Sequence, residues 1–151
     1  MEELAAIGKL IREQDNRITD APIFIVEKKV RDYGYADSFT DDFQWCNSSV
    51  QEVADERQAR ILDKMRERGR DIEDWELIGY CDRWEFVTAC FTEQGCKDFI
   101  RRDGHNHGKT RIYATGSYRN QEYRTVRQFL MGLQGSGHAA ESNTKSEKGN
   151  L

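Results

Sequence analysis

The sequence predicts an α+β domain of two layers, with three to four mostly antiparallel strands packed against about four helices. Apolar residues recur at helical spacing in four segments, and runs typical of strands stand between them. No predicted strand is followed by the glycine-rich loop of a phosphate-binding α/β fold. The chain has 151 residues, the usual length of one domain. We expect that domain to span residues 1–134, with a disordered polar tail over 135–151, where the sequence is small, polar and aperiodic.

The first half of the chain predicts a helix, two strands and a second helix. The first strand opens with a continuous apolar run, typical of burial on both faces, and then alternates. The second helix has a long apolar stripe, with Ser48 and Ser49 as candidate N-caps and Gly69 at its end. The four predicted elements cover residues 2–13, 22–35, 43–46 and 50–69.

The second half predicts further strands and two helices. Its first segment carries apolar residues in both alternation classes, so it is one central strand or two strands joined near 81–83. Thr92 is a candidate N-cap for the helix that follows, and Gly104 ends that helix. The predicted elements are strand 75–91, helix 92–102, strand 111–114 and helix 120–135.

Charge is distributed unevenly along the chain. The net charge is −4, yet residues 1–96 carry 22 acidic and 13 basic side chains, whereas residues 97–127 carry 3 acidic and 8 basic ones. This asymmetry indicates either a charged partner or ion pairs between the two parts. No run of about 18 apolar residues exists, which excludes a membrane-spanning helix. The acidic start Met1-Glu2-Glu3 is unlike a signal peptide, so we expect a cytoplasmic protein.

The cysteines and aspartates suggest no catalytic or metal centre. No two cysteines have C-x-x-C spacing, and apolar surroundings should raise the pKa of the thiols, so we predict free, unreactive thiols in a reducing compartment. Asp37, Asp41 and Asp42 could bind a hard cation, but the glycine and terminal glutamate of a calcium loop are missing. A solvated loop is the prediction there. The four cysteines are Cys46, Cys81, Cys90 and Cys96.

The densest polar cluster is the turn 101–109, for which three hypotheses stay open. His105 and Asn106 could hydrogen-bond the turn itself. A zinc site could be formed by Cys90, Cys96, His105 and His107. A metal-dependent nuclease centre of the His-Asn-His type could be formed by Asp103, His105, Asn106 and His107. The spacing argues against both metal sites, because the cysteines are expected in the sheet and on a helix core face. A final nuclease ligand is also missing. We therefore predict no metal and no cofactor.

The second half of the chain contains three strings that carry a resemblance, WEFVTACFTEQGCKDFI, DGHN and RIYATGSYRNQEY. Together they resemble a group of short proteins encoded by tailed bacteriophages and prophages. The match covers roughly residues 75–133. The resemblance implies no catalytic residue. It implies an accessory protein that binds and blocks a host protein, such as a defence nuclease complex. The matching positions are Thr92, Gly95, His105, Asn106, Ile112, Tyr113, Arg119, Asn120 and Glu122.

Three functional hypotheses follow. The first is a non-enzymatic inhibitor of a host complex, an anti-CRISPR or other anti-defence factor, which binds its partner through acidic residues. The second is a nucleic-acid binder or nuclease that uses the basic part of the chain, and the third is a sponge for a phosphate-bearing signal near Arg111, Tyr113 and Arg119. The same basic residues could also anchor a protein interface or form ion pairs with the acidic part.

The residues expected at each site differ in charge. The partner-binding set is Asp37, Asp41, Asp42, Glu52, Asp55 and Glu56. The alternative nucleic-acid or ligand set is Arg101, Arg102, His105, Asn106, Arg111, Tyr113 and Arg119.

Overall fold

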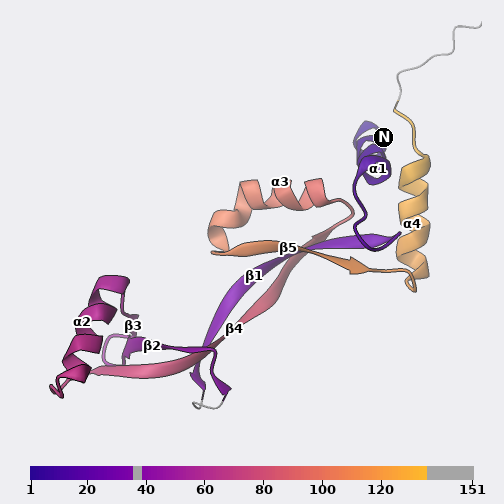
Figure 1. Ribbon diagram of the computed structural model, residues 1–151. Helices are drawn as coiled ribbons and strands as arrows, with labels where there is room; N and C mark the ends of the chain where they lie inside the picture. The colour runs from indigo at the N-terminus through magenta and orange to yellow at the C-terminus, as the bar shows by residue number, and fades with distance from the viewer. Residues whose placement is uncertain (36–38, 136–151) are drawn as a thin grey trace, which may run out of the picture. The chain divides into compact units, whose positions relative to one another are not determined.

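The computed structural model describes residues 1–35 and 39–135, and over these ranges it confirms the α+β class (Figure 1). Four α-helices accompany one five-stranded sheet with the strand order β3-β2-β4-β1-β5. The predicted disordered tail lies outside the described residues, apart from residue 135. The elements are α1 (Glu2–Glu13), β1 (Pro22–Tyr35), β2 (Asp42–Asn47), β3 (Glu52–Val53), α2 (Glu56–Glu67), β4 (Trp75–Cys90), α3 (Glu93–Asp103), a short 3-10 turn η2 (Gly104–Asn106), β5 (Thr110–Gly116) and α4 (Gln121–Gly132).

Most predicted elements are found at their predicted places. The bounds of α1 and β1 equal the predicted ones, and the region from residue 75 is one long strand rather than two. Thr92 accepts a hydrogen bond from the backbone N–H of Gly95 at 2.9 Å, which caps α3 as expected. Asn120 caps α4 in the same way, through the N–H of Tyr123 at 3.0 Å.

The predicted start of the second helix is wrong. The helix begins at Glu56 rather than at residue 50, and its N-cap is Asp55, whose carboxylate accepts from the N–H of Gln58 at 2.8 Å. Ahead of it, Asn47 Oδ1 accepts from the N–H of Ser49 at 2.9 Å, a local bond that competes with helix formation. Gln51 has a φ of 54°, in the left-handed region that a continuous helix excludes. The turn leads into β3, a short additional strand that the sequence did not predict.

The chain divides into two compact units. Unit 1 comprises Met1–Ile25, Ala89–Phe99 and Ile112–Leu151. Unit 2 comprises Val26–Thr88 and Ile100–Arg111.

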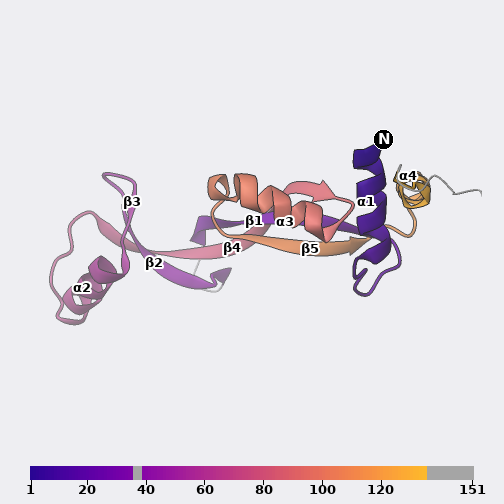
Figure 2. The same ribbon diagram turned by 90° about the horizontal axis from the view of Figure 1, so that it is seen from above.

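Unit 1 is held by the packing of α1 against α4, which lie side by side in both ribbon views (Figures 1 and 2). Gly8 makes this close approach possible, because a Cβ at that position would overlap the carbonyl oxygen of Leu130. Ile11 and Leu130 are both buried. Arg12 also donates to the carbonyl oxygen of Met131, which satisfies an acceptor near the end of α4.

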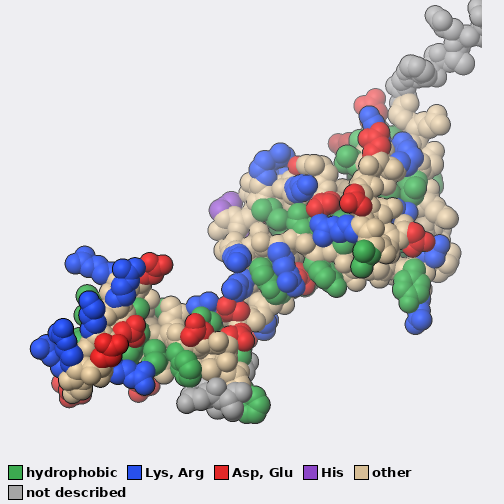
Figure 3. All heavy atoms as spheres, viewed as in Figure 1, with side chains coloured by type: hydrophobic (Ala, Val, Ile, Leu, Met, Phe, Trp, Pro, Cys, Tyr) green, Lys and Arg blue, Asp and Glu red, His purple; other side chains and the backbone are tan. Residues whose placement is uncertain are grey.

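Unit 2 has its own apolar core, beneath α2. Three residues are buried together there: Trp45 of β2, Ala54 just before α2, and Leu62 of α2. Leu77 of β4 packs against them. Trp45 lies opposite Leu77 in the antiparallel register of β2 and β4. The indole N–H of Trp45 donates to Asp63 Oδ1 at 2.8 Å, so the buried ring keeps a polar partner on the helix. The other face of α2 is covered with charged side chains of both signs (Figure 3).

Candidate binding pocket in unit 2

A pocket of about 250 Å³ lies in unit 2, lined by strand residues on one side and by α2 with its N-cap on the other. From the strands come Arg31, Phe43, Gln44, Trp45, Leu77 and Tyr80. From the helix and the residues just before it come Ala54, Asp55, Glu56, Ala59 and Asp63.

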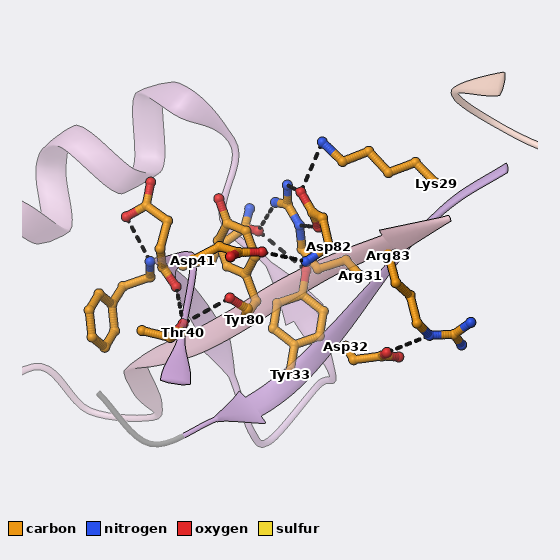
Figure 4. A network of polar contacts seen from close by, with 12 residues as sticks. Lys29, Arg31, Asp32, Tyr33, Thr40, Asp41, Tyr80, Asp82 and Arg83 are labelled. Carbon is orange, nitrogen blue, oxygen red and sulfur yellow. Dashed lines mark hydrogen bonds and ion pairs between the residues drawn. The ribbon is translucent and has the colours of Figure 1, made fainter. Parts of the chain in front are cut away.

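The strands supply polar side chains to the pocket because neighbouring strands present matching rows. Side chains two residues apart share one face of a strand. Lys29, Arg31 and Tyr33 therefore lie on one face of β1, and Tyr80 and Asp82 lie together on β4. Since β1 and β4 are neighbours in the sheet, the two rows meet (Figure 4).

Arg31 is fixed at the centre of this polar network. Its Nε and Nη2 atoms donate to the two carboxylate oxygens of Asp82, at 2.8 and 3.0 Å. Its Nη1 atom donates to Gln44 Oε1 at 2.8 Å, and its guanidinium lies 3.7 Å from the centroid of the Tyr80 ring. Lys29 Nζ reaches Asp82 at 2.9 Å (Figure 4). Arg31 is thus held by Asp82, Gln44 and the Tyr80 ring.

This pairing changes the protonation equilibria of both partners. The hydrogen bonds from Arg31, and then from Lys29, hold the pKa of Asp82 well below its ordinary value. The same bond to Asp82 raises the pKa of Arg31 further above its already high value. Both groups therefore stay ionised, and the charge of Arg31 is balanced by Asp82 and is not offered to a ligand.

The helix side of the pocket is acidic. Asp55, Glu56 and Asp63 each contribute a carboxylate. Asp55 caps α2 and Asp63 accepts from the Trp45 indole, while Glu56 forms only a 3.4 Å ion pair with the exposed Arg60. Together with Asp82 and the cations Arg31, Lys29 and Arg60, the group has three cations and four carboxylates, a small excess of negative charge. The pocket is therefore suited to a cationic group, which carboxylates and aromatic faces both attract.

The predicted acidic residues are only partly brought together. Asp55 and Glu56 line the pocket, and Glu52 is exposed on β3. Asp41 accepts from the N–H of Asp82 at 2.9 Å, and Asp42 from the N–H of Phe43 at 2.8 Å, so these two carboxylates bond to backbone N–H groups. The sixth predicted residue, at position 37, lies outside the described residues.

The sequence did not indicate the remaining pocket residues. Arg31, Gln44, Asp63 and Tyr80 were not predicted as a site. The available signal was the polar row of β1 from Lys29 onward, which follows the apolar run at the start of the strand. That row could be seen in the sequence, but the strand that would face it could not.

The alternative basic set is divided between the units. Arg101 and Arg102 are exposed in the last turn of α3, and His105 and Asn106 are exposed in η2. These four residues belong to unit 2.

The rest of that set lies on or just after β5. Arg111, in unit 2, donates to Glu27 at 2.7 Å and lies 4.2 Å from the centroid of the Trp84 ring. Tyr113 is exposed on β5 in unit 1, and Arg119 lies over the Tyr118 ring in the same unit. The seven residues are therefore spread over two units and do not make up one described site.

The His-Asn turn bonds to its own helix end. Asp103 accepts from Asn106 Nδ2 at 2.6 Å, and its other oxygen lies 2.7 Å from His107 Nε2. The hydrogen bond with His107 lowers the pKa of Asp103 the most, and the hydrogen bond from Asn106 lowers it further. Asn106 thus bonds to the turn as predicted, whereas the histidine that contacts Asp103 is His107, not His105. Within residues 1–35 and 39–135, no three His, Cys, Asp or Glu side chains are placed to hold a metal ion.

Burial keeps two of the four thiols, Cys96 and Cys46, protonated more firmly than a thiol in water. All four cysteines are free. Burial, and then the neighbouring Cys90, raises the pKa of Cys96 to about 12, so this thiol stays protonated at neutral pH. Burial also raises the pKa of Cys46.

None of the helices in the described part of the chain is long and apolar enough to cross a membrane.

Comparison of the chain with models of protein families, with curated proteins and with solved structures gives no match. The chemistry of the pocket is therefore the basis on which a function is proposed.

Proposed function

We propose that this protein is a non-enzymatic binding protein that inhibits or redirects a host protein complex, and that the acidic pocket of unit 2 holds an arginine or lysine side chain of that complex. One observation carries the proposal: three carboxylates and the rings of Phe43 and Tyr80 line a pocket in which, among the described residues, the one lining cation is Arg31, already paired with Asp82. A cation from a partner would meet a surplus of negative charge.

Such a pocket suits the anchor residues of protein interfaces. Arginine is enriched among the few residues that dominate binding energy, and it is most effective in a pocket that excludes water. A cation over an aromatic face contributes about 0.5–2 kcal/mol, and a hydrogen bond to a charged group about 1.5–3 kcal/mol. Asp63 and Glu56 are the carboxylates that bind the partner's cation, because the carboxylate of Asp55 already caps α2.

The class of partner follows from charge and from the resemblance to phage accessory proteins. Complexes that act on nucleic acid present basic grooves, and an acidic protein can compete for such a groove. Residues 1–96 carry a clear excess of acidic side chains. We therefore propose a host defence complex as the partner, which would make the protein an anti-CRISPR or other anti-defence factor.

The first experiment tests the pocket with a defined probe. The full chain is titrated with a short arginine peptide and, separately, with a glutamate peptide of equal length, while NMR follows the indole N–H of Trp45, which bonds to Asp63. We expect a saturable shift of this signal with the arginine peptide only. The double variant Glu56→Gln/Asp63→Asn should weaken binding about tenfold or more, equivalent to about 1.4 kcal/mol.

The control variant is Glu2→Gln/Glu3→Gln, which removes two exposed carboxylates from α1 in unit 1. It should bind the arginine peptide as the wild type does. An unmoved Trp45 signal, or equal loss of binding in both double variants, would contradict the pocket.

The second experiment identifies the partner. Affinity purification from a bacterial host with the wild type and with both double variants should retain one host complex in the wild type and control only. Retention by all three proteins would place the interface elsewhere. A gel shift with nucleic acid at low salt tests the alternative, a nucleic-acid-binding protein, because phosphate contacts are strongest at low salt.

A further inference from the structure

A second pocket, of about 230 Å³, lies in unit 1 beside α4. Its notable member is Arg127, whose side chain lines the pocket although the residue is only 8% exposed. The lining residues are Asp20, Ala21, Arg124, Arg127, Gln128 and Met131, and we call this site the α4 arginine pocket.

Arg127 is buried without a counter-charge. Its Nη2 atom has a long hydrogen bond to Asn16 Oδ1, at 3.4 Å, and its Nη1 atom faces the sulfur of Met131, a weak acceptor, at 3.3 Å. Its Nε atom is buried and has no hydrogen-bond partner among the described residues. Over residues 1–35 and 39–135, no carboxylate forms an ion pair with it.

A buried guanidinium in this state is costly, because charge removed from water must be balanced by an opposite charge and its donors by acceptors. Arginine cannot relieve the cost by losing its proton. Arg31 in unit 2 provides the comparison, since its guanidinium is satisfied by both oxygens of Asp82. The missing component at Arg127 is an anion with several acceptor oxygens.

The remaining pocket residues narrow the chemistry of that anion. Arg124 lies one turn before Arg127 on the same face of α4, and its Nη1 atom donates to the carbonyl oxygen of Tyr118 at 3.0 Å. Two guanidinium groups therefore line the pocket. Asp20 lines it too and, within residues 1–35 and 39–135, forms no ion pair with either arginine, so a carboxylate lies beside the place where an anion would bind.

We propose that the α4 arginine pocket binds a phosphate-class anion that carries a P–OH group, either free inorganic phosphate or the terminal phosphate of a small monoester. The two arginines bind its oxygens, as guanidinium groups suit phosphate. Asp20 accepts the hydrogen bond of the P–OH group, which sulfate lacks. Pockets for larger ligands have volumes of roughly 300–1,000 Å³, and this pocket is smaller. It therefore has room for the phosphate group and not for a large remainder of the molecule.

The experiment uses the full chain in calorimetric titrations and in thermal unfolding, with phosphate, sulfate or acetate at matched ionic strength. We expect saturable binding of phosphate, a melting temperature that rises with its concentration, and sulfate binding at least about tenfold weaker. Arg127→Met and Arg124→Gln should each weaken phosphate binding about tenfold or more. Asp20→Asn should narrow the difference between phosphate and sulfate.

Two further arms complete the test. Arg70→Gln, at an exposed arginine of unit 2, should leave phosphate binding unchanged. Glycerol phosphate identifies the source: tighter binding than inorganic phosphate indicates a monoester, and weaker binding indicates the free ion.

The unfolding of Arg127→Met in chloride separates a ligand site from a structural role. With chloride as the only added anion and no phosphate present, removal of the buried charge should leave stability unchanged or increased. Absence of a saturable phosphate effect in the wild type would overturn the proposal. So would a destabilised Arg127→Met protein that still responds to phosphate as the wild type does.

Discussion

At the scale of single residues, two arginines show how the surroundings decide the role of one side chain. Arg31 and Arg127 both leave bulk water at least in part. Arg31 meets Asp82 through two hydrogen bonds, which makes it a fixed element of the sheet surface. Arg127 has no such pair of bonds among the described residues, and its buried Nε atom has no hydrogen-bond partner there. Neither difference is visible from the residue type alone.

The Arg31–Asp82 pair predicts a pH-dependent stability. Asp82→Asn should lower the free energy of unfolding at pH 7 by about 1–3 kcal/mol, because Arg31 and Lys29 lose a charged acceptor. The pKa of Asp82 in the folded protein lies below its ordinary 3.8, so the wild type loses this advantage as pH falls below about 4. Urea unfolding at several pH values should show the two proteins converging in acid.

Glu56→Gln is the matched control for that comparison. Glu56 is exposed, and its ion pair within the described part of the chain is with the likewise exposed Arg60, so its removal should change stability by less than about 0.5 kcal/mol. A constant difference between Asp82→Asn and the wild type down to pH 2 would contradict the assigned role of the carboxylate.

At the scale of elements, helix positions were predicted well except where a side chain competes with the backbone. The stripes of α1 and α4 repeat without interruption, and both helices lie where the sequence placed them. The stripe before α2 includes Val50 and Val53, whose spacing fits a helix. Asn47 bonds to the backbone there, and Gln51 adopts a left-handed conformation, so the same apolar residues belong to a turn and to β3.

The contact of α1 with α4 predicts a large effect from a small change. Gly8→Ala should destabilise the protein by about 1–3 kcal/mol, since the added methyl group meets the backbone of Leu130 and the helices must separate. Gly132→Ala, in α4, is the control, because a Cβ there meets nothing within 4 Å beyond its chain neighbours and the backbone of its own helix. It should be neutral or stabilising by up to about 1 kcal/mol.

Thermal or urea unfolding of both variants checks this prediction. The substitution at Gly8 also gains helix propensity, which acts in the opposite direction. An unchanged or increased stability of Gly8→Ala would therefore show that the helices are not in close contact.

At the scale of the whole molecule, the sheet order predicts where protection from exchange is greatest. β1 has neighbours on both sides, and Phe24 and Val26 are fully buried on it. β3 has two exposed residues at the sheet edge. Hydrogen exchange should be slowest for amides in the interior of β1 and fastest, among the strands, for β3. Equal protection of the two strands would contradict the strand order.

The sequence by itself determined the class of the fold, most of the elements and the uneven charge. Those features depend on neighbours along the chain: apolar periodicity, local capping by Thr92 and Asn120, and the net charge of each segment. It also placed Asp55 and Glu56 in its acidic set, and both line the pocket of unit 2, at the start of a helix that begins later than expected.

Only the tertiary structure decided what these residues face. The rows of β1 and β4 meet because the strands are neighbours, and strand pairing is set by long-range packing, which local pattern does not encode. The joining of Arg31 to Asp82 and the burial of Arg127 without a counter-charge both follow from such distant contacts. A charge in the sequence is a residue type; its partner, and hence its chemistry, is a property of the folded chain.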